Sequence, residues 1–132
     1  MMRLITLLLI CVTVPFLGGC EKDVPPKLSL KTEGSYVSSD IIVTPGSSFT
    51  VGGIAEKTKD ELSLYYVEVA YDGSSAGRLV ERWFIHPDFR SRYEKDYVVT
   101  VRNTSGRERW IFCVNDEEGR ISKREIRVTV QP

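Results

Sequence analysis

The sequence predicts an all-β domain, an antiparallel β-sandwich of about seven strands. Apolar and polar residues alternate along many short segments, so that every second side chain shares a face. This is the pattern of a strand with one face in a core and one in water. The alternating segments are rich in β-branched and aromatic residues, which favour strands. Turn-forming residues separate them, and no amphipathic helix of useful length is present.

Alternation and turn residues place each strand in order along the chain. Tyr65, Val67 and Val69, for example, alternate with more polar neighbours and are expected to face the core. Short spacing without helices favours a sandwich over a barrel for a domain of about 110 residues. We expect strands near residues 27–32, 40–43, 48–54, 63–71, 78–85, 95–102, 108–115 and 122–130.

The first residues are typical of an export signal. Arg3 supplies a positive start, and residues 4–14 are apolar but too short for a bilayer, which needs roughly 20 apolar residues. Leu17-Gly18-Gly19-Cys20 then resembles the lipobox of bacterial lipoproteins. We predict a signal peptide over residues 1–19, with Cys20 as the lipid-bearing first residue of the mature protein. An ordinary secretory signal and a membrane anchor are the alternatives, and neither requires a cysteine at this position.

Residues 20–26 are predicted to form the lipidated N-terminus and a short tether, followed by one sandwich domain over residues 27–132. Pro25-Pro26 favours extended backbone. Acyl chains on Cys20 would hold the protein to a membrane, since each buried CH₂ contributes about 0.8 kcal/mol and one chain alone is marginal. Glu21 is not the aspartate associated with inner-membrane retention. By resemblance to lipoprotein sorting rules, the outer membrane is therefore favoured, on either its periplasmic or its exposed face.

The charge balance argues against a nucleic-acid partner. The sequence holds 18 basic and 18 acidic residues, so its formal net charge is zero. The charges are interspersed, as on a solvated surface, and no basic excess suits a phosphate backbone. Residues 123–127, although rich in Lys and Arg, are interpreted as a solvated strand face.

The chemistry-bearing residues do not form a recognisable catalytic or metal motif. Cys113 is the one cysteine left after signal removal and lipidation, and its apolar surroundings predict a buried core residue. His86 lacks a metal partner at ligand spacing and a Gly-x-Ser-x-Gly nucleophile motif. The acidic residues 115–119 suit either calcium or a hairpin turn with Gly119 at positive φ, and the turn is favoured. We predict no enzyme activity and no cofactor.

Residues 82–93 carry the strongest candidates for ligand binding, because aromatic rings and arginines are enriched in interfaces and rings also stack on sugars. By alternation, one of Trp83 and Phe84 is expected to face the core. The candidate residues are Trp83, Phe84, Phe89, Arg90 and Tyr93.

Several segments together carry a resemblance to a known class of domain. They are Pro25-Pro26-Lys27-Leu28-Ser29-Leu30, residues 34–40, Val43-Thr44-Pro45-Gly46, residues 114–120 and residues 126–130. With these segments the sequence resembles the small immunoglobulin-like, cadherin-like or PKD-like sandwich domains of Bacteroides-type surface lipoproteins. The resemblance implies an immunoglobulin-like sandwich fold and a periplasmic or cell-surface location, and it implies no catalytic residues. The paired cysteines of antibody domains are missing, so no inter-sheet disulfide is expected.

Together these features predict a membrane-anchored, non-enzymatic binding module of the cell envelope with a protein or glycan ligand. The alternative is an accessory carbohydrate-binding lipoprotein of an outer-membrane glycan uptake system, which would use the aromatic residues of 83–93. Because sandwich folds host many functions, the class of partner remains an analogy.

Overall fold

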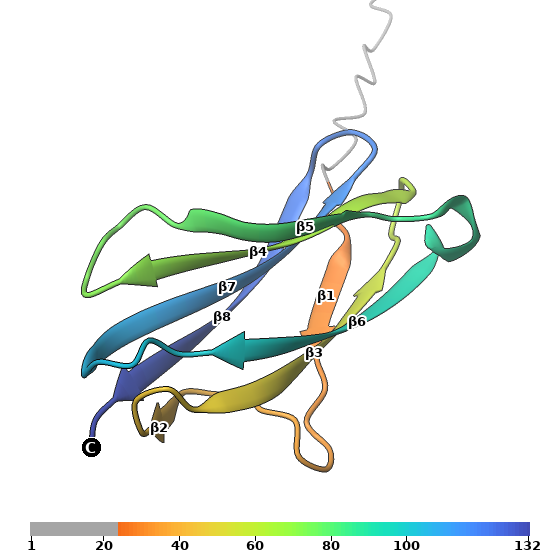
Figure 1. Cartoon of the computed structure of the whole chain (residues 1–132). Helices are drawn as coiled ribbons and strands as arrows, with labels where there is room; N and C mark the ends of the chain where they lie inside the picture. Colours follow the sequence, from red (N-terminus) through yellow and green to blue (C-terminus); the bar gives the residue numbers. More distant parts are fainter. Residues whose placement is uncertain (1–23) are drawn as a thin grey trace, which may run out of the picture.

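The computed structural model describes residues 24–132, which form eight strands and a single 3₁₀ turn (Figure 1). The predicted signal peptide and Cys20 lie outside the described residues. The elements are β1 (Lys27–Leu30), β2 (Ile41–Val43), β3 (Ser48–Glu56), β4 (Leu62–Tyr71), β5 (Arg78–Phe84), η1 (Pro87–Phe89), β6 (Arg92–Thr100), β7 (Gly106–Asp116) and β8 (Ile121–Val130).

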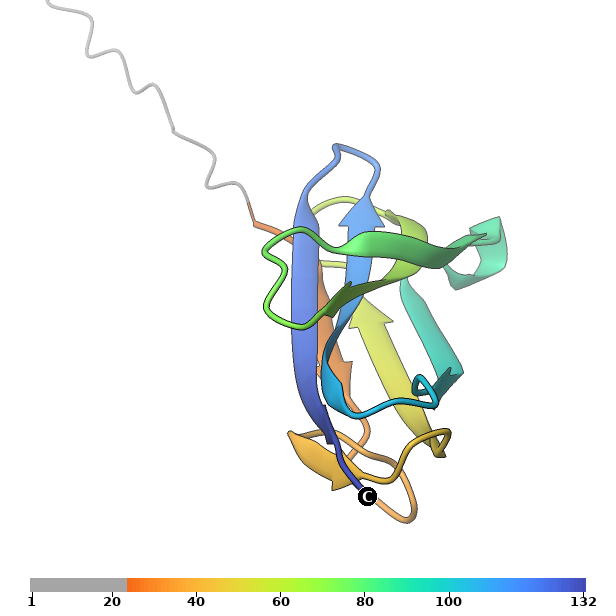
Figure 2. The ribbon, with the colours of Figure 1, turned by 60° about the vertical axis from the view of Figure 1, so that its left-hand side comes forward.

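The strands form two sheets packed face to face, so the predicted all-β sandwich is confirmed (Figure 2). Sheet A has the order β1-β3-β6, and sheet B has the order β2-β8-β7-β4-β5. One detail of the prediction is wrong, because β2 runs parallel to β8 rather than antiparallel. The chain crosses from sheet A before it forms β2, so no tight hairpin reverses its direction beside β8.

The largest extensions beyond the predicted ranges are in β3 and β6. β3 and β6 pair without interruption from Ser48 opposite Thr100 to Glu56 opposite Arg92. From the sequence, the polar residues at the end of this ladder predicted a loop after residue 54 and a start of the later strand at residue 95. Exposed polar side chains are nevertheless compatible with a paired edge, because only the inward positions need to be apolar.

The core lies between the sheets and follows the predicted alternation. Tyr65, Val67 and Phe112 are fully buried, as are the inward residues of β8. Cys113 points to the outer face of sheet B and is nevertheless buried, as predicted, with 0% exposure. Ile111, two residues earlier on the same face, is also buried, and Gly77 of the β4–β5 turn lies against it. The turn at residues 72–77 therefore folds back over the outer face of sheet B.

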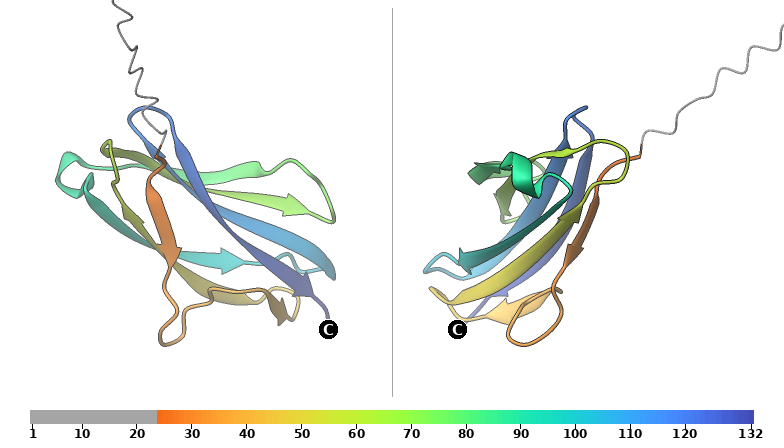
Figure 3. Two further views of the ribbon diagram at one scale, coloured as in Figure 1. Left: turned by 180° about the vertical axis from the view of Figure 1, so that it is seen from behind. Right: turned by 90° about the vertical axis from the view of Figure 1, so that its right-hand side faces the viewer.

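The termini mark two ends of the sandwich (Figure 3). Residues 24–26 lie beside the β7–β8 hairpin, where the Ser122 hydroxyl donates to the Pro26 carbonyl. We call this the N-terminal end. The far end carries β2, the β4–β5 turn and the last residues of β8. β7 starts at this end as well, since its first residue, Gly106, pairs with Val130 of β8. Within residues 24–132, no helix is long and apolar enough to cross a membrane.

Candidate ligand-binding groove

A groove of about 900 Å³ lies at the far end, on the outer face of sheet B. Ile41 and Ile42 of β2 form one wall, and residues 73–75 of the folded-back turn form the other. The floor is made by β7 and β8, together with Ala70 of β4. The walls come from segments that are distant in sequence, so the groove depends on the tertiary fold.

Three arginines lie in this groove. Arg109 on β7 stands directly opposite Arg127 on β8, and Arg107 stands opposite Thr129, two residue pairs nearer the far end. Glu125 lies between two of them, with its carboxylate 3.6 Å from Nη1 of Arg109 and 3.3 Å from Nε of Arg127. Two carboxylates, Glu125 and Asp40, therefore stand against three guanidinium groups at this groove, which leaves one positive charge in excess.

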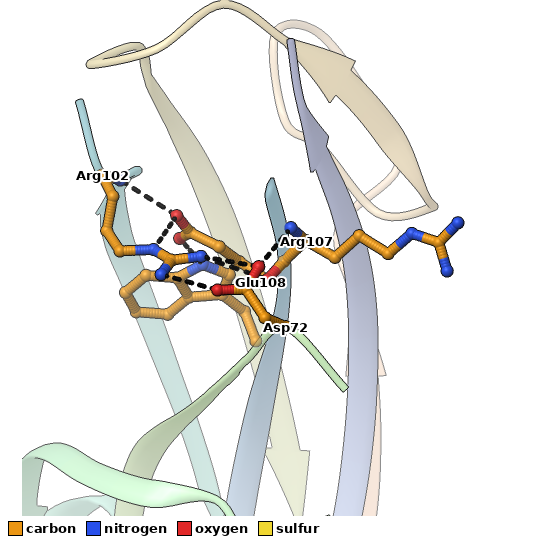
Figure 4. Close-up of polar contacts among 5 residues, drawn as sticks. Asp72, Arg102, Arg107 and Glu108 are labelled. Carbon is orange, nitrogen blue, oxygen red and sulfur yellow. Dashed lines mark hydrogen bonds and ion pairs between the residues drawn. The ribbon is translucent and has the colours of Figure 1, made fainter. Parts of the chain in front are cut away.

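The three guanidiniums differ in how firmly the protein holds them. Arg109 donates hydrogen bonds to the carbonyls of Ser74 (3.3 Å) and Ser75 (3.0 Å), which ties the wall of the groove to its floor. The Arg127 side chain is 77% exposed, and its contact with Glu125 is made through Nε. The Arg107 side chain is exposed and points away from the polar cluster beneath the strand (Figure 4). Arg107 and Arg127 therefore keep donors available to a ligand.

A polar latch, formed by Asp72, Arg102, Glu108 and Trp110, fixes the far end from the inner side of β7 (Figure 4). Arg102 donates two hydrogen bonds to the Asp72 carboxylate, at 3.0 and 3.2 Å, and its Nε lies 3.2 Å from Oε2 of Glu108. Glu108 Oε1 accepts a hydrogen bond of 3.0 Å from the Trp110 indole. The latch joins the β6–β7 loop to the β4–β5 turn, and so supports the strand that carries two of the groove arginines.

The latch also links stability to pH. Hydrogen bonds from the Arg102 side chain and the Arg107 backbone lower the pKa of Asp72 below its ordinary value. A carboxylate with a lowered folded-state pKa stabilises the fold above its unfolded pKa of about 3.9 and loses that contribution as the pH falls through the folded value. Hydrogen bonding, chiefly from Tyr36, lowers the pKa of Asp96 as well.

We therefore expect Asp72→Asn to flatten the acid side of the stability profile. Asn tolerates the positive φ of 50° at this position, so the backbone is preserved. Melting temperatures measured between pH 7 and pH 2.5 should show a lower value for the variant at neutral pH and a smaller fall on acidification. Asp96→Asn serves as a comparison at a distant carboxylate. Parallel curves for the wild type and Asp72→Asn would contradict a stabilising role for the ionised carboxylate.

The structure divides the aromatic residues that the sequence singled out. Of Trp83 and Phe84, one of which was expected to face the core, Trp83 does so, with its ring centroid 6.1 Å from Tyr65 and 5.8 Å from Tyr97. Tyr93 also packs on Tyr65, at 5.8 Å. Phe84 points to the opposite face and is 77% exposed.

The remaining two candidates lie around the 3₁₀ turn. Phe89 is 54% exposed and lines a small hollow of about 370 Å³ together with Tyr93. Arg90 donates to the Ile85 carbonyl and pairs with Glu117 at 3.3 Å, so its guanidinium is engaged within the domain. The five candidates therefore do not share one surface.

Other sequence predictions concern turns. Asp116 Oδ1 accepts hydrogen bonds from the backbone N–H groups of Glu118 (3.0 Å) and Arg120 (2.9 Å), and Gly119 has a φ of 80°. This is the predicted capped hairpin turn. His86 precedes the 3₁₀ turn and accepts a hydrogen bond from the Asp88 backbone. The part of the chain from residue 24 onward holds no group of three or more potential metal-ligating side chains of the His, Cys, Asp and Glu types.

Cys113 is expected to be chemically inert in the folded protein. Burial raises the pKa of its thiol to about 12, so the reactive thiolate is scarce near neutral pH. We expect a thiol reagent at pH 8 to label it on the order of a thousandfold more slowly in the native protein than in urea. The variant Cys113→Ser is the control, because any labelling that it still shows must come from another thiol. Fast labelling of the native protein, absent in that variant, would contradict the burial.

Comparison with known proteins gives a likeness to solved structures only. No family model matches the chain, and no curated protein sequence does. A chitin binding domain from Burkholderia pseudomallei superposes with a TM-score of 0.53 at 8% identity, over 71% of this chain and 58% of its own. Spo0M, a sporulation control protein from Bacillus subtilis, gives 0.53 at 8% identity, over 83% of this chain and 50% of its own.

A family 123 glycoside hydrolase from Clostridium perfringens gives a TM-score of 0.51 at 6% identity, over 80% of this chain and 27% of the hydrolase. The likeness is one of fold. The chain thus spans between about a quarter and three fifths of the length of these three structures.

Sequence reasoning missed both the groove and the latch. The signal for the latch was available, since Glu108 falls on an inward position of β7, where an unpaired carboxylate would be costly. The signal for the arginines lay in the hairpin register, because a turn centred on residues 117–119 sets Arg109 against Arg127. The folded-back turn that forms a wall of the groove left no comparable local signal.

Proposed function

We propose that the protein is a lipid-anchored, non-enzymatic binding module of the cell envelope, and that its ligand occupies the groove at the far end. The observation that carries the proposal is the groove itself. Its volume of about 900 Å³ falls within the range of ligand sites, roughly 300–1,000 Å³. Its side chains include Arg107 and Arg127, whose donors are not fully used within the protein.

The anchor rests on the sequence, where the apolar segment and lipobox precede Cys20. The geometry of the domain is compatible with it. Residues 24–26 enter the fold at the N-terminal end, and Thr58 donates a hydrogen bond of 3.0 Å to the Pro25 carbonyl there. A membrane attached through Cys20 would lie toward that end, with the groove at the other.

A binding role is favoured over catalysis by the scatter of the reactive groups. His86 is an exposed turn residue without a neighbouring nucleophile in hydrogen-bond contact. Cys113 is buried with a raised pKa. An active site would bring such groups together with an acid or base in one pocket.

A glycan ligand is the more specific form of the proposal, in an accessory role for an outer-membrane uptake system. Two structures of similar fold are described as a chitin binding domain and as a glycoside hydrolase. Their descriptions indicate that a sandwich of this kind can occur in proteins that bind or hydrolyse sugars, although a fold alone does not determine a function. Membership of the Bacteroides-type lipoproteins belongs to the same proposal.

The anchor is tested with the full chain expressed in a bacterium that processes lipoproteins. Labelling with an alkyne palmitate analogue should mark the wild type, and the protein should sediment with membranes. Cys20→Ser should lose both properties, whereas Cys113→Ser, matched in chemistry, should keep them. Wild-type protein that remains unlabelled and soluble would refute the anchor.

The position of the site is tested on a glycan array with the mature lipoprotein in detergent. Phe84→Ser and Phe89→Ser change exposed rings, so they should leave both folding and binding intact if the groove is the site. Trp83→Ala is a poorer choice, because Trp83 packs against core tyrosines. Loss of binding in either phenylalanine variant would move the site to residues 83–93.

A further inference from the structure

The groove concentrates positive charge at a cost to the fold. Arg109 and Arg127 stand directly opposite each other on paired strands, and like charges in that position destabilise a sheet. Arg107 adds a third guanidinium in the same groove, and the carboxylates of Glu125 and Asp40 compensate for two of the three positive charges. An anionic ligand would reduce the repulsion between these guanidinium groups, so the charge of the groove favours a negatively charged ligand.

The other polar groups around the arginines suit a ligand rich in hydroxyls. Ser74, Ser75 and Thr129 line the groove, and they can donate or accept hydrogen bonds. Asp40 also lines it and accepts the Arg127 backbone N–H through Oδ1, which leaves Oδ2 as an acceptor. None of the described residues that line the groove is aromatic, so a neutral sugar would lack a ring to stack on.

The backbone of the groove floor disfavours a peptide ligand. Extended peptides commonly bind by adding a strand to an open sheet edge. Both floor strands are already paired on both sides, β8 with β2 and β7, and β7 with β8 and β4. The groove floor therefore offers a ligand side chains rather than an open ladder of backbone groups, as sugar recognition requires, and the short edge strand β2 forms only a wall.

We propose that this groove binds an acidic glycan, with Arg107 and Arg127 recognising its carboxylate or sulfate groups and the surrounding hydroxyl and carboxylate side chains binding its sugar hydroxyls. The inference rests on the proposed function and names its ligand class. Guanidinium groups form paired, charge-assisted hydrogen bonds with such anions. Arg109 acts as a positioning residue, because its bonds to Ser74 and Ser75 hold the wall in place.

The test compares four probes by calorimetric titration of the mature protein in detergent. The probes are an oligogalacturonate, a sulfated heparin-type oligosaccharide, a neutral chitooligosaccharide and an oligoglutamate peptide. The first two distinguish carboxylate from sulfate recognition. We expect at least one of them to bind more tightly than both the neutral sugar and the peptide, and to weaken as salt screens the charges.

Arg107→Gln and Arg127→Gln should each raise the dissociation constant about tenfold or more, as loss of a charge-assisted hydrogen bond does. Neither side chain supports the core, so melting temperatures should stay close to wild type. Arg82→Gln is the matched control, because Arg82 is exposed on β5 of the same sheet but does not line the groove. It should leave affinity unchanged.

Several results would overturn the inference. If Arg82→Gln lost as much affinity as the groove variants, the acidic oligosaccharide would be attracted by the overall charge of the protein and not by the groove. Preferred binding of the neutral sugar or of the peptide, abolished by Arg107→Gln, would reject the acidic glycan but keep the groove as a binding site. Absence of binding to both acidic oligosaccharides would also reject the inference. The labelling of Cys20 and the array are unaffected by these outcomes, so the proposed function is judged separately.

Discussion

Glu108→Ala is expected to lower the free energy of unfolding by about 3 kcal/mol, as removal of one partner from a buried ion pair does. The Glu108 side chain is fully buried, and its two oxygens accept hydrogen bonds from the Trp110 indole and from the backbone and side chain of Arg102. Alanine leaves these donors without their acceptor. Arg102 keeps its bonds to Asp72, so the loss should fall at the lower end of the range for buried pairs.

Urea unfolding followed by tryptophan fluorescence measures this loss. Glu108→Gln keeps an acceptor oxygen and the shape of the side chain, so its cost should be clearly smaller. Glu81→Ala is the control, because Glu81 is exposed on β5 and surface changes usually stay within about 0.5 kcal/mol. If Glu108→Ala were no more harmful than that control, the latch would not stabilise the far end.

Gly53→Ala is expected to lower the free energy of unfolding by about 2–3 kcal/mol, the upper part of the range of about 1–3 kcal/mol for overpacking a filled core. A Cβ at Gly53 would clash with the Tyr65 hydroxyl oxygen and lie 2.9 Å from Tyr65 Cζ. Tyr65 is fully buried between the sheets, so it has little room to move. The adjacent Gly52→Ala should cost less, since its nearest contact is the flexible side chain of Lys31.

A double mutant distinguishes this clash from a loss of backbone freedom. The Tyr65 hydroxyl is buried and lacks a hydrogen-bond partner among the described residues. Tyr65→Phe should therefore be neutral or slightly stabilising, because it removes an unpaired polar group. When Gly53→Ala is combined with Tyr65→Phe, it should cost less than it does in the wild type. An equal cost in the two backgrounds would show that the hydroxyl contact is not its cause.

The sequence predicted the elements whose signal is local. Strand positions followed from alternation, and the same rule required one of Trp83 and Phe84 to face the core, which the structure shows to be Trp83. Burial of Cys113 followed from its apolar neighbours, and Asp116 and Gly119 specified the hairpin turn. In each case, the residues that determine the structure lie within a few positions of one another.

The candidate site was not predictable in the same way. Its floor follows from one hairpin register, but its walls depend on two long-range arrangements, the parallel pairing of β2 with β8 and the return of residues 72–77 over the sheet. The aromatic cluster of residues 83–93 drew attention because it was contiguous in sequence. Alternation and the turn at Pro87–Phe89 then separated its members in space.

The position of β1 has a mechanical consequence. Under the proposed function, a membrane pulling on the N-terminus and a ligand held at the far end would stretch the domain along its length. β1 starts at the N-terminal end and pairs antiparallel with β3 from Lys27 to Leu30. Tension along this strand loads its ladder in shear, so that the hydrogen bonds share the force rather than open one by one. Arg124 of β8 also binds the Leu28 carbonyl at 2.9 Å, so sheet B takes up part of the same load.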